Sequence, residues 1–354
     1  MITPNKNILL TGAGFTKDFG GYLGSEMWAV IFNQEEISHY PRLRDLMLSV
    51  LDYEQAYSLV TDLKDHLAFK EEEKQAFTRA IQKSYQQMHE SICSGMMKHN
   101  YAKILFESVV HRFEGSLTNN DQIKERGFFF TLNQDLFLER FYYNEPRVSR
   151  MLKIPGIPNP NQKWFDRRLG QLGEEDWVTL PTDEELQKIA SHFWEPLEGA
   201  FAYLKLHGSY GWKSAIWSDA MVIGGQKAGF IEREPLLRWY FSLFKQVLYR
   251  PNCNLVVIGY SFRDAHINSV ILEAIQKYSL RLFAISPEEP GSFRSKFTEP
   301  TAMQDFFAAN DGSLIWKGLH GYYFGTSQGL CDGDRPGDLS PMGKSLFRKL
   351  GLVE

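Results

Sequence analysis

A chain of 354 residues is long enough for one large α/β domain, or for one domain that carries a sizeable insertion. Its formal net charge of −4 lacks the basic excess that is typical of nucleic-acid-binding proteins, so we expect nucleic acid to be at most an indirect partner. The sequence contains no uninterrupted apolar stretch of roughly 18 residues, so we predict no membrane span.

Five short apolar runs, rich in β-branched and aromatic residues, predict strands of a covered sheet. These runs are residues 7–11, 127–131, 202–206, 255–258 and 280–285, with 313–316 as a weaker sixth. Helical segments separate the runs, so the sequence predicts an α/β fold. We expect a Rossmann-like parallel sheet of about six strands with helices on both faces.

The longest segments between the predicted strands are too long for simple crossovers. Residues 35–126 are dense in helix-forming side chains and predict a helical insertion. Residues 145–200 predict an irregular and helical excursion, in which Asp183 is expected to cap a helix over 184–193.

The remaining segments define the predicted domain boundaries. The Rossmann core comprises residues 1–34 and 127–328. Residues 329–354 form a C-terminal tail that is rich in glycine, aspartate and proline at its start, with a short helix expected over 342–350.

The three cysteines, Cys93, Cys253 and Cys331, lie far apart and form no Cys-x-x-Cys pair. A zinc ribbon needs such pairs, so we predict no zinc and no other metal site. The sparse, odd number of cysteines favours a reducing compartment over a disulfide scaffold. We therefore predict a cytoplasmic protein, and expect no signal peptide because the first apolar run is brief and soon followed by glycines.

The first predicted strand ends in Gly12-Ala13-Gly14, followed by Phe15 and Thr16. Glycines at this place allow a tight turn and let backbone N–H groups approach a pyrophosphate. The usual dinucleotide fingerprint has a third glycine where this chain has Lys17. A structural turn without a ligand therefore stays an alternative at this point.

Polar residues also follow the next two strands. Asn133 and Asp135 come directly after the run of three phenylalanines, and His207 follows the strand at 202–206. The two former residues could cap a helix, and a histidine in such a position could be structural. A histidine there could equally serve as a base near neutral pH.

Two further turns complete the set: Gly259-Tyr260-Ser261-Phe262 after the fourth strand and Ser286 after the fifth. In an open parallel sheet, ligands bind beyond the carboxyl ends of the strands. All five turns are therefore expected to converge on one ligand site.

In this order, the turns resemble the sirtuin (Sir2) superfamily, and more closely the zinc-free Sir2-like domains of bacterial antiphage defence proteins. The resemblance covers residues 5–290 and is least in the helical insertions. Further residues typical of that branch are Gly20-Gly21, Leu23-Gly24 with Met27-Trp28, the segment 53–58, and the segment 259–264 with Ile267-Asn268.

The resemblance implies a role for each turn. Asn133 and Asp135 match the catalytic and nicotinamide-pocket pair, and His207 matches the catalytic histidine. The residues expected to contact NAD are Gly12, Ala13, Gly14, Phe15, Thr16, Gly259, Ser261, Phe262 and Ser286.

The chain departs from sirtuin deacylases in two ways. It lacks both Cys-x-x-Cys pairs, so the helical insertion would replace the zinc subdomain. It also has Gly21-Tyr22-Leu23-Gly24 where the deacylases carry Pro-Asp-Phe-Arg. These departures favour NAD hydrolysis, with NAD as the substrate and nicotinamide and ADP-ribose as products. A non-catalytic NAD- or ADP-ribose-binding regulatory subunit, a protein ADP-ribosyltransferase and a deacylase stay as alternatives.

The same resemblance suggests how the protein is controlled. An NAD hydrolase that acts in antiphage defence must stay silent until infection, because NAD depletion harms the host. We therefore expect a homo-oligomer, with a separate HerA-type ATPase as a possible partner.

Overall fold

The computed structural model describes residues 2–61, 69–94, 96–118, 123–141, 152–157, 174–195, 200–215, 220–298, 312–332 and 335–353. The predicted excursion at 145–200 falls in large part outside these residues.

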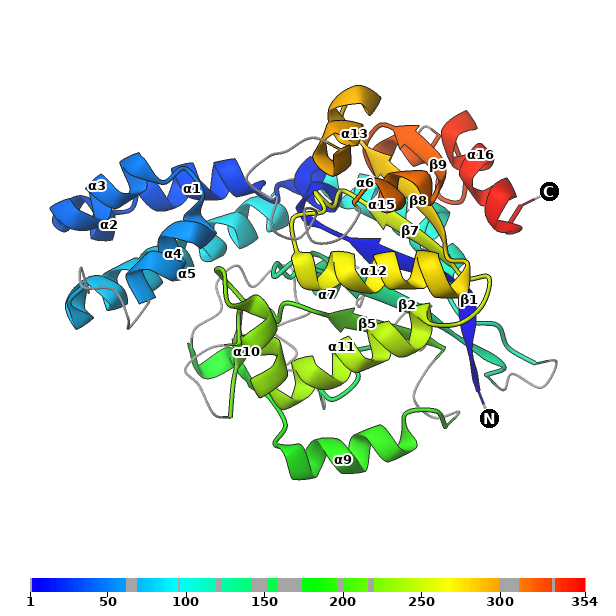
Figure 1. The fold of residues 1–354 in the computed structure, drawn as a ribbon, viewed down its shortest axis with the longest axis horizontal. Helices are drawn as coiled ribbons and strands as arrows, with labels where there is room; N and C mark the ends of the chain where they lie inside the picture. Colours follow the sequence, from blue (N-terminus) through cyan, green and yellow to red (C-terminus); the bar gives the residue numbers. More distant parts are fainter. Residues whose placement is uncertain are drawn as a thin grey trace.

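The central sheet consists of β1 (Thr3–Thr11), β2 (Glu125–Thr131), β3 (Leu152–Lys153), β5 (Phe201–Lys205), β7 (Asn254–Ile258), β8 (Arg281–Ser286) and β9 (Leu319–Phe324). The strands are parallel and lie in the order β3-β5-β2-β1-β7-β8-β9 (Figure 1). A second sheet pairs β4 (Val178–Thr179) with β6 (Trp212–Lys213). The predicted α/β fold with a Rossmann-like parallel sheet is confirmed, and the two-residue β3 adds a seventh strand.

The strand order reverses between β1 and β7. From β1 the chain continues outward through β2 and β5, and it later returns to the other side of β1 to form β7, β8 and β9. Open α/β sheets bind their ligands beyond the carboxyl ends of the strands, at such a switch point. The topology therefore predicts a ligand site at the turns that follow β1 and β7.

The described helices are α1 (Gly24–Phe32), α2 (Glu35–His39), α3 (Pro41–Ser49), α4 (Tyr53–Thr61), α5 (Glu71–Cys93), α6 (Met96–Ser108), α7 (Phe137–Phe141), α9 (Asp183–His192), α10 (Lys227–Arg233), α11 (Pro235–Leu248), α12 (Ala265–Tyr278), α13 (Pro290–Thr298), α15 (Ser313–Lys317) and α16 (Pro341–Leu350). Short 3-10 helices are η1 (Ala13–Phe15), η2 (Lys17–Phe19), η3 (Val110–Phe113), η4 (Glu174–Asp176) and η6 (Gln328–Leu330). Figure 1 shows α11 and α12 in front of the sheet and α6 behind it.

The phenylalanines of β2 are buried because helices cover both faces of the strand, and successive side chains of a strand point to opposite faces. The ring of Phe130 lies against Phe244 of α11, with 5.0 Å between the ring centroids. The ring of Phe129 faces the other way and lies 5.9 Å from that of Phe15. The turn after β1 is thus anchored on the sheet by an aromatic side chain.

Helices α1 to α5 lie together to one side of the sheet (Figure 1). The 23-residue helix α5 packs against α1, α2 and α4, and its inner end contacts α7. Its buried side chains recur at the spacing of one helix face, including Phe77, Ala80, Tyr85 and Met88. The predicted insertion at 35–126 contains α2 to α6, and the domain boundaries themselves stay a prediction.

Two local predictions were wrong. Residues 313–316 lie in α15, and the sixth predicted strand is instead β9, which begins at Leu319. The cap of α9 is Thr182 rather than Asp183, because the Thr182 hydroxyl accepts the N–H of Glu185 at 3.4 Å. Among the described residues, no helix is both long and apolar enough to cross a membrane.

Candidate functional site

The turns after β1 and β7 touch at the switch point. Gly259 has φ = +65°, and a Cβ atom there would lie 2.4 Å from the carbonyl carbon of Gly14. A Cβ on Gly12 would in turn lie 2.8 Å from the carbonyl oxygen of Gly259. The glycines are therefore required for the two turns to approach each other.

The backbone of these turns is hydrogen-bonded across the switch point. The N–H of Gly12 donates to the carbonyl of Ile258 at 3.0 Å, and the N–H of Gly14 donates to the carbonyl of Gly259 at 2.9 Å. These two N–H groups are thus engaged within the protein. Between them, Ala13 is the exposed residue of the turn.

Thr16 links the turn after β1 to the turn after β2. Its hydroxyl donates to Oδ2 of Asp135 at 2.9 Å and accepts from the side-chain amide of Asn133 at 3.4 Å. All three residues are buried, and Asn133 is 8% exposed. The structure therefore brings three of the predicted site residues into one hydrogen-bonded group.

Asp135 is held from its other side as well. Its Oδ1 accepts the N–H of Phe137 at 3.0 Å, at the start of α7, and Lys205 donates to its backbone carbonyl. Burial raises the pKa of the Asp135 carboxyl, although the nearby Lys205 ammonium and these hydrogen bonds oppose the shift. The Asp135 carboxylate thus bonds the first N–H of α7 as well as Thr16, although Leu136 is the residue that immediately precedes the helix.

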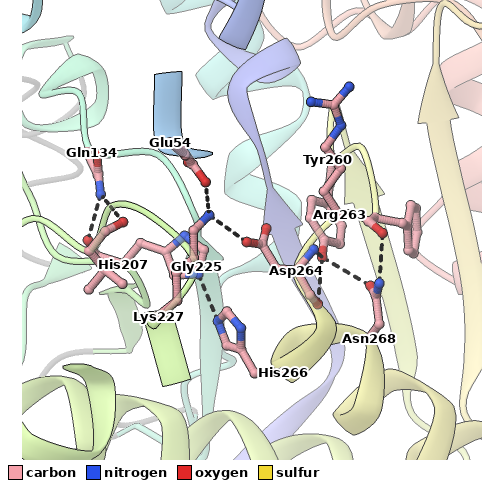
Figure 2. A network of polar contacts seen from close by, with 12 residues as sticks. Glu54, Gln134, His207, Gly225, Lys227, Tyr260, Arg263, Asp264, His266 and Asn268 are labelled. Carbon is pink, nitrogen blue, oxygen red and sulfur yellow. Dashed lines mark hydrogen bonds and ion pairs between the residues drawn. The ribbon is translucent and has the colours of Figure 1, made fainter. Parts of the chain in front are cut away.

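Gln134, between the two predicted residues, joins the turns after β2 and β5. Its amide nitrogen donates to the carbonyl of His207 at 3.1 Å (Figure 2) and to that of Val222 at 2.9 Å. Its oxygen accepts from Tyr85 of α5. Asn133 and His207 therefore flank a fixed junction on neighbouring strands.

The His207 imidazole is buried and faces a second imidazole. Its Nε2 lies 3.0 Å from Nε2 of His266, at the start of α12 (Figure 2). Burial lowers the pKa of His207 well below its usual value, and it lowers that of His266 to about 4. Both imidazoles are therefore neutral at neutral pH.

A charged group lies beside the two histidines. Nζ of Lys227 lies 2.7 Å from Oδ1 of Asp264 and 2.7 Å from Oε2 of Glu54 (Figure 2). Burial raises the pKa of Asp264, but His207 and Lys227 in their charged forms outweigh it and hold this pKa at about 2. Burial lowers the pKa of Lys227, but the two carboxylates outweigh it and the net shift is upward. Asp264 and Lys227 therefore form an ionised pair at neutral pH, whereas burial raises the pKa of Glu54.

The sequence prediction gave no role to Glu54, Lys227, Asp264 or His266. Asp264 and Glu54 lie within segments that carry the family resemblance, and His266 lies two residues beyond Asp264. Nothing in the sequence indicates that α4 and α10 meet at this turn, so Lys227 could not have been found from it.

The structure describes the positions of several residues that were predicted to contact NAD, but it does not test those contacts. Phe15 and Phe262 are buried, and Phe262 packs against Phe293 with 5.7 Å between ring centroids. Ser261 is half-buried after β7, and the hydroxyl of Ser286 accepts the N–H of Glu288 at 3.2 Å. Contacts between these residues and NAD stay predictions.

The strand order and the glycine turns define a dinucleotide-binding class of α/β protein. The chain belongs to the SIR2-like domain family, whose model matches residues 127–309. SIR2-like domains are in general NAD-dependent enzymes, with NAD as their substrate. The matched segment contains Asn133, His207 and Gly259, while β1 and its turn precede it. A comparison with curated proteins found no match.

Proposed function

We propose that the protein hydrolyses NAD at the nicotinamide–ribose bond. In this reaction the C–N bond breaks, neutral nicotinamide leaves, and water adds to the sugar carbon to give ADP-ribose and a proton. The sugar passes through an oxocarbenium-like state, so a site accelerates the step by positioning NAD and by stabilising developing charge.

His207 and Asn133 have the chemistry that this step needs. A neutral imidazole accepts a proton from a ribose hydroxyl or from water, a contribution of about 10²–10⁴ in rate. The Asn133 amide orients the same hydroxyl or water. Asp135 orients the nicotinamide end of the pocket through its contact with Thr16.

One observation carries the proposal: Gln134 hydrogen-bonds the β2 turn to the β5 turn beside the switch point. It fixes the relative positions of the two residues on which catalysis would depend. A protein that only binds NAD has little need for an amide and a neutral imidazole held in this way.

The test is nicotinamide release from NAD, measured by chromatography with wild-type protein and single variants. His207→Ala and Asn133→Ala are each expected to lower the rate at least about 100-fold. His192→Ala and Asn33→Ala remove the same side chains at exposed positions and are expected to keep the rate. Thermal unfolding of all four variants at the wild-type temperature shows that the fold is intact. Full activity in either site variant contradicts the proposed roles.

The products distinguish this activity from its rivals. Free ADP-ribose supports hydrolysis, whereas label from NAD on a protein acceptor supports ADP-ribosyl transfer. Conversion of an acyl-lysine peptide supports deacylation. Tight binding of NAD in calorimetry without any product supports a regulatory binding subunit.

We further propose that the hydrolase acts as an antiphage effector, as a homo-oligomer and under the control of a separate ATPase partner of the HerA type. This rests on the family resemblance and on the need to keep NAD hydrolysis off in a healthy cell. The test compares nicotinamide release by the protein alone with release after addition of its neighbouring gene product, with the assembly state of each sample measured by light scattering. A chain that is fully active as a monomer contradicts this proposal.

A further inference from the structure

Three side chains that can bind a metal meet at the turn after β5. His207, Asp264 and His266 each offer one ligand atom, and these atoms all lie within 4.8 Å of one another. The two Nε2 atoms are 3.0 Å apart. Two ligands of one tetrahedral zinc ion, at bonds of 2.0–2.1 Å, lie about 3.4 Å apart. Small side-chain rotations therefore suffice to place an ion between the three.

Hydrogen bonds and aromatic packing around the three residues hold this arrangement. Asp264 precedes α12, and its N–H donates to the hydroxyl of Tyr260 at 3.1 Å. The Tyr260 hydroxyl also donates to the Asn268 side chain at 3.0 Å, which holds the turn against the helix (Figure 2). His266 packs beside Phe241 of α11, with 5.8 Å between ring centroids. The ligand set is thus supported by surrounding contacts, as metal ligands in proteins generally are.

The charges of the cluster also suit a cation. Nζ of Lys227 binds Oδ1 of Asp264, so an ion would use the second carboxylate oxygen, Oδ2. Glu54 binds the same lysine, so the ammonium lies between two carboxyl groups beside the two imidazoles. Two imidazole nitrogens with one carboxylate are a ligand set for zinc and other borderline transition metals rather than for magnesium or calcium.

We propose that His207, His266 and Asp264 bind a divalent transition-metal ion of the zinc class, and that this ion inhibits NAD hydrolysis by occupying the lone pair of His207 Nε2. The inhibition rests on the proposed hydrolase function, whereas the binding does not. In the metal-free protein the two imidazoles share an N–H···N hydrogen bond instead, which the ion replaces.

Metal binding is tested by calorimetry on chelator-treated, full-length protein, with Zn²⁺ as the probe and Mg²⁺ as the control ion. One Zn²⁺ per chain is expected, with no comparable binding of Mg²⁺. His266→Ala, His266→Gln and Asp264→Asn are each expected to weaken Zn²⁺ binding at least about 10-fold, since loss of even an outer-shell partner costs 10–100-fold. His192→Ala is the control, because His192 lies on the surface beside Glu195, where adventitious zinc would bind. Co²⁺ absorption reports the coordination geometry independently of affinity.

The inhibition is tested by nicotinamide release with and without one equivalent of Zn²⁺, each variant being compared with its own metal-free rate. Zn²⁺ is expected to lower the wild-type rate at least about 10-fold. The rate of His266→Gln with Zn²⁺ is expected to equal the rate of the same variant without Zn²⁺. Wild-type Zn²⁺ affinity in the His266 and Asp264 variants overturns the proposed site. Site-specific Zn²⁺ binding by a protein that releases no nicotinamide overturns the hydrolase function and the inhibition, while the metal site stands.

Discussion

Gly259 occupies a position where an added methyl group would collide with backbone rather than with a movable side chain. Its φ is +65°, and an added Cβ would lie 2.4 Å from both the carbonyl carbon of Gly14 and the backbone nitrogen of Phe15. Strain at such a residue costs about 1–3 kcal/mol before any collision is counted. Of the glycines at the switch point, Gly259 therefore combines a left-handed backbone with the closest backbone approach.

Gly259→Ala is expected to lower the free energy of unfolding by at least about 3 kcal/mol and to weaken NAD binding, because the turns after β1 and β7 must separate. Denaturant unfolding and calorimetry measure the two effects. Gly229→Ala is the matched control: nothing lies within 4 Å of its added Cβ, and it lies in α10. This control is expected to stabilise the protein by about 0.5–1 kcal/mol. Equal stability of the two variants would argue against the close approach.

The Thr16 hydroxyl is predicted to matter for its hydrogen bonds rather than for its bulk. Thr16→Val replaces the hydroxyl that donates to Asp135 and accepts from Asn133. The buried carboxylate then loses a partner, so we expect a loss of about 1–3 kcal/mol in unfolding free energy and slower nicotinamide release. Thr16→Ser keeps the hydroxyl and is expected to retain both. A valine variant as active as the serine variant would show that this contact is dispensable.

For single residues, the sequence predicted which polar side chains follow the strands. A buried apolar run with polar residues at its end indicates the carboxyl edge of a sheet. Asn133, Asp135 and His207 were located in this way. Lys227 and His266 were not, because their importance comes from contacts between α4, α10 and α12. Such contacts depend on how the helices pack, which no local pattern in the chain expresses.

Among the elements, α4 is tied to the candidate site by side chains rather than by apolar packing alone. Glu54 of α4 binds Lys227, which begins α10 and also binds Asp264 before α12. Ser58 of α4 accepts the N–H of Gly225 at 2.6 Å. A helix of the predicted insertion thus holds the two turns that surround His207.

Lys227→Met is expected to loosen α4 from these turns, because it leaves two carboxylates without their shared counter-ion. Breaking a buried ion pair costs about 3–5 kcal/mol, and the lower value is expected since the Glu54 side chain is 33% exposed. Denaturant unfolding measures the loss, and faster amide exchange in α4 locates it.

Lys188→Met provides the control for this change. Lys188 pairs with Glu184 on the surface of α9, where both side chains are more than two-thirds exposed. Such pairs contribute about 0–1 kcal/mol. If Lys227→Met destabilises the protein no more than Lys188→Met does, the group does not hold α4 in place.

The elements were predictable where apolar runs were short and bounded, as in β1, β2, β5, β7 and β8. The run at 313–316 was misassigned because four apolar or small residues fit a strand and a helical turn equally well. The true edge strand, β9, has mostly half-buried or exposed side chains and contains Gly321, so its pattern is weak.

For the molecule as a whole, the sheet carries the candidate site, and α5 connects it to the helical arm formed by α1 to α4. Tyr85 of α5 donates to Gln134, and its ring stacks on Tyr210 with 6.3 Å between centroids. One turn later, the His89 ring lies 6.5 Å from that of Tyr210. The junction between arm and sheet is therefore aromatic and contains a buried imidazole.

His89 makes this junction sensitive to acid. Burial, together with the positive charges of Arg140 and Lys205, lowers the pKa of His89 to about 3. In the unfolded chain this pKa is about 6.5, so the unfolded state takes up the proton first as the pH falls. The contribution of the neutral, buried His89 to the unfolding free energy is thus complete above pH 6.5. It is lost as the pH falls from about 6.5 towards 3. This residue alone is expected to lower the unfolding free energy by about 2 kcal/mol between pH 7 and pH 5.

Denaturant unfolding across this range measures how steeply the unfolding free energy depends on pH. His89→Leu is expected to flatten it, whereas His192→Leu, at an exposed position of α9, is expected to leave it as in the wild type. An unchanged slope in His89→Leu would mean that other groups control the acid sensitivity of the junction.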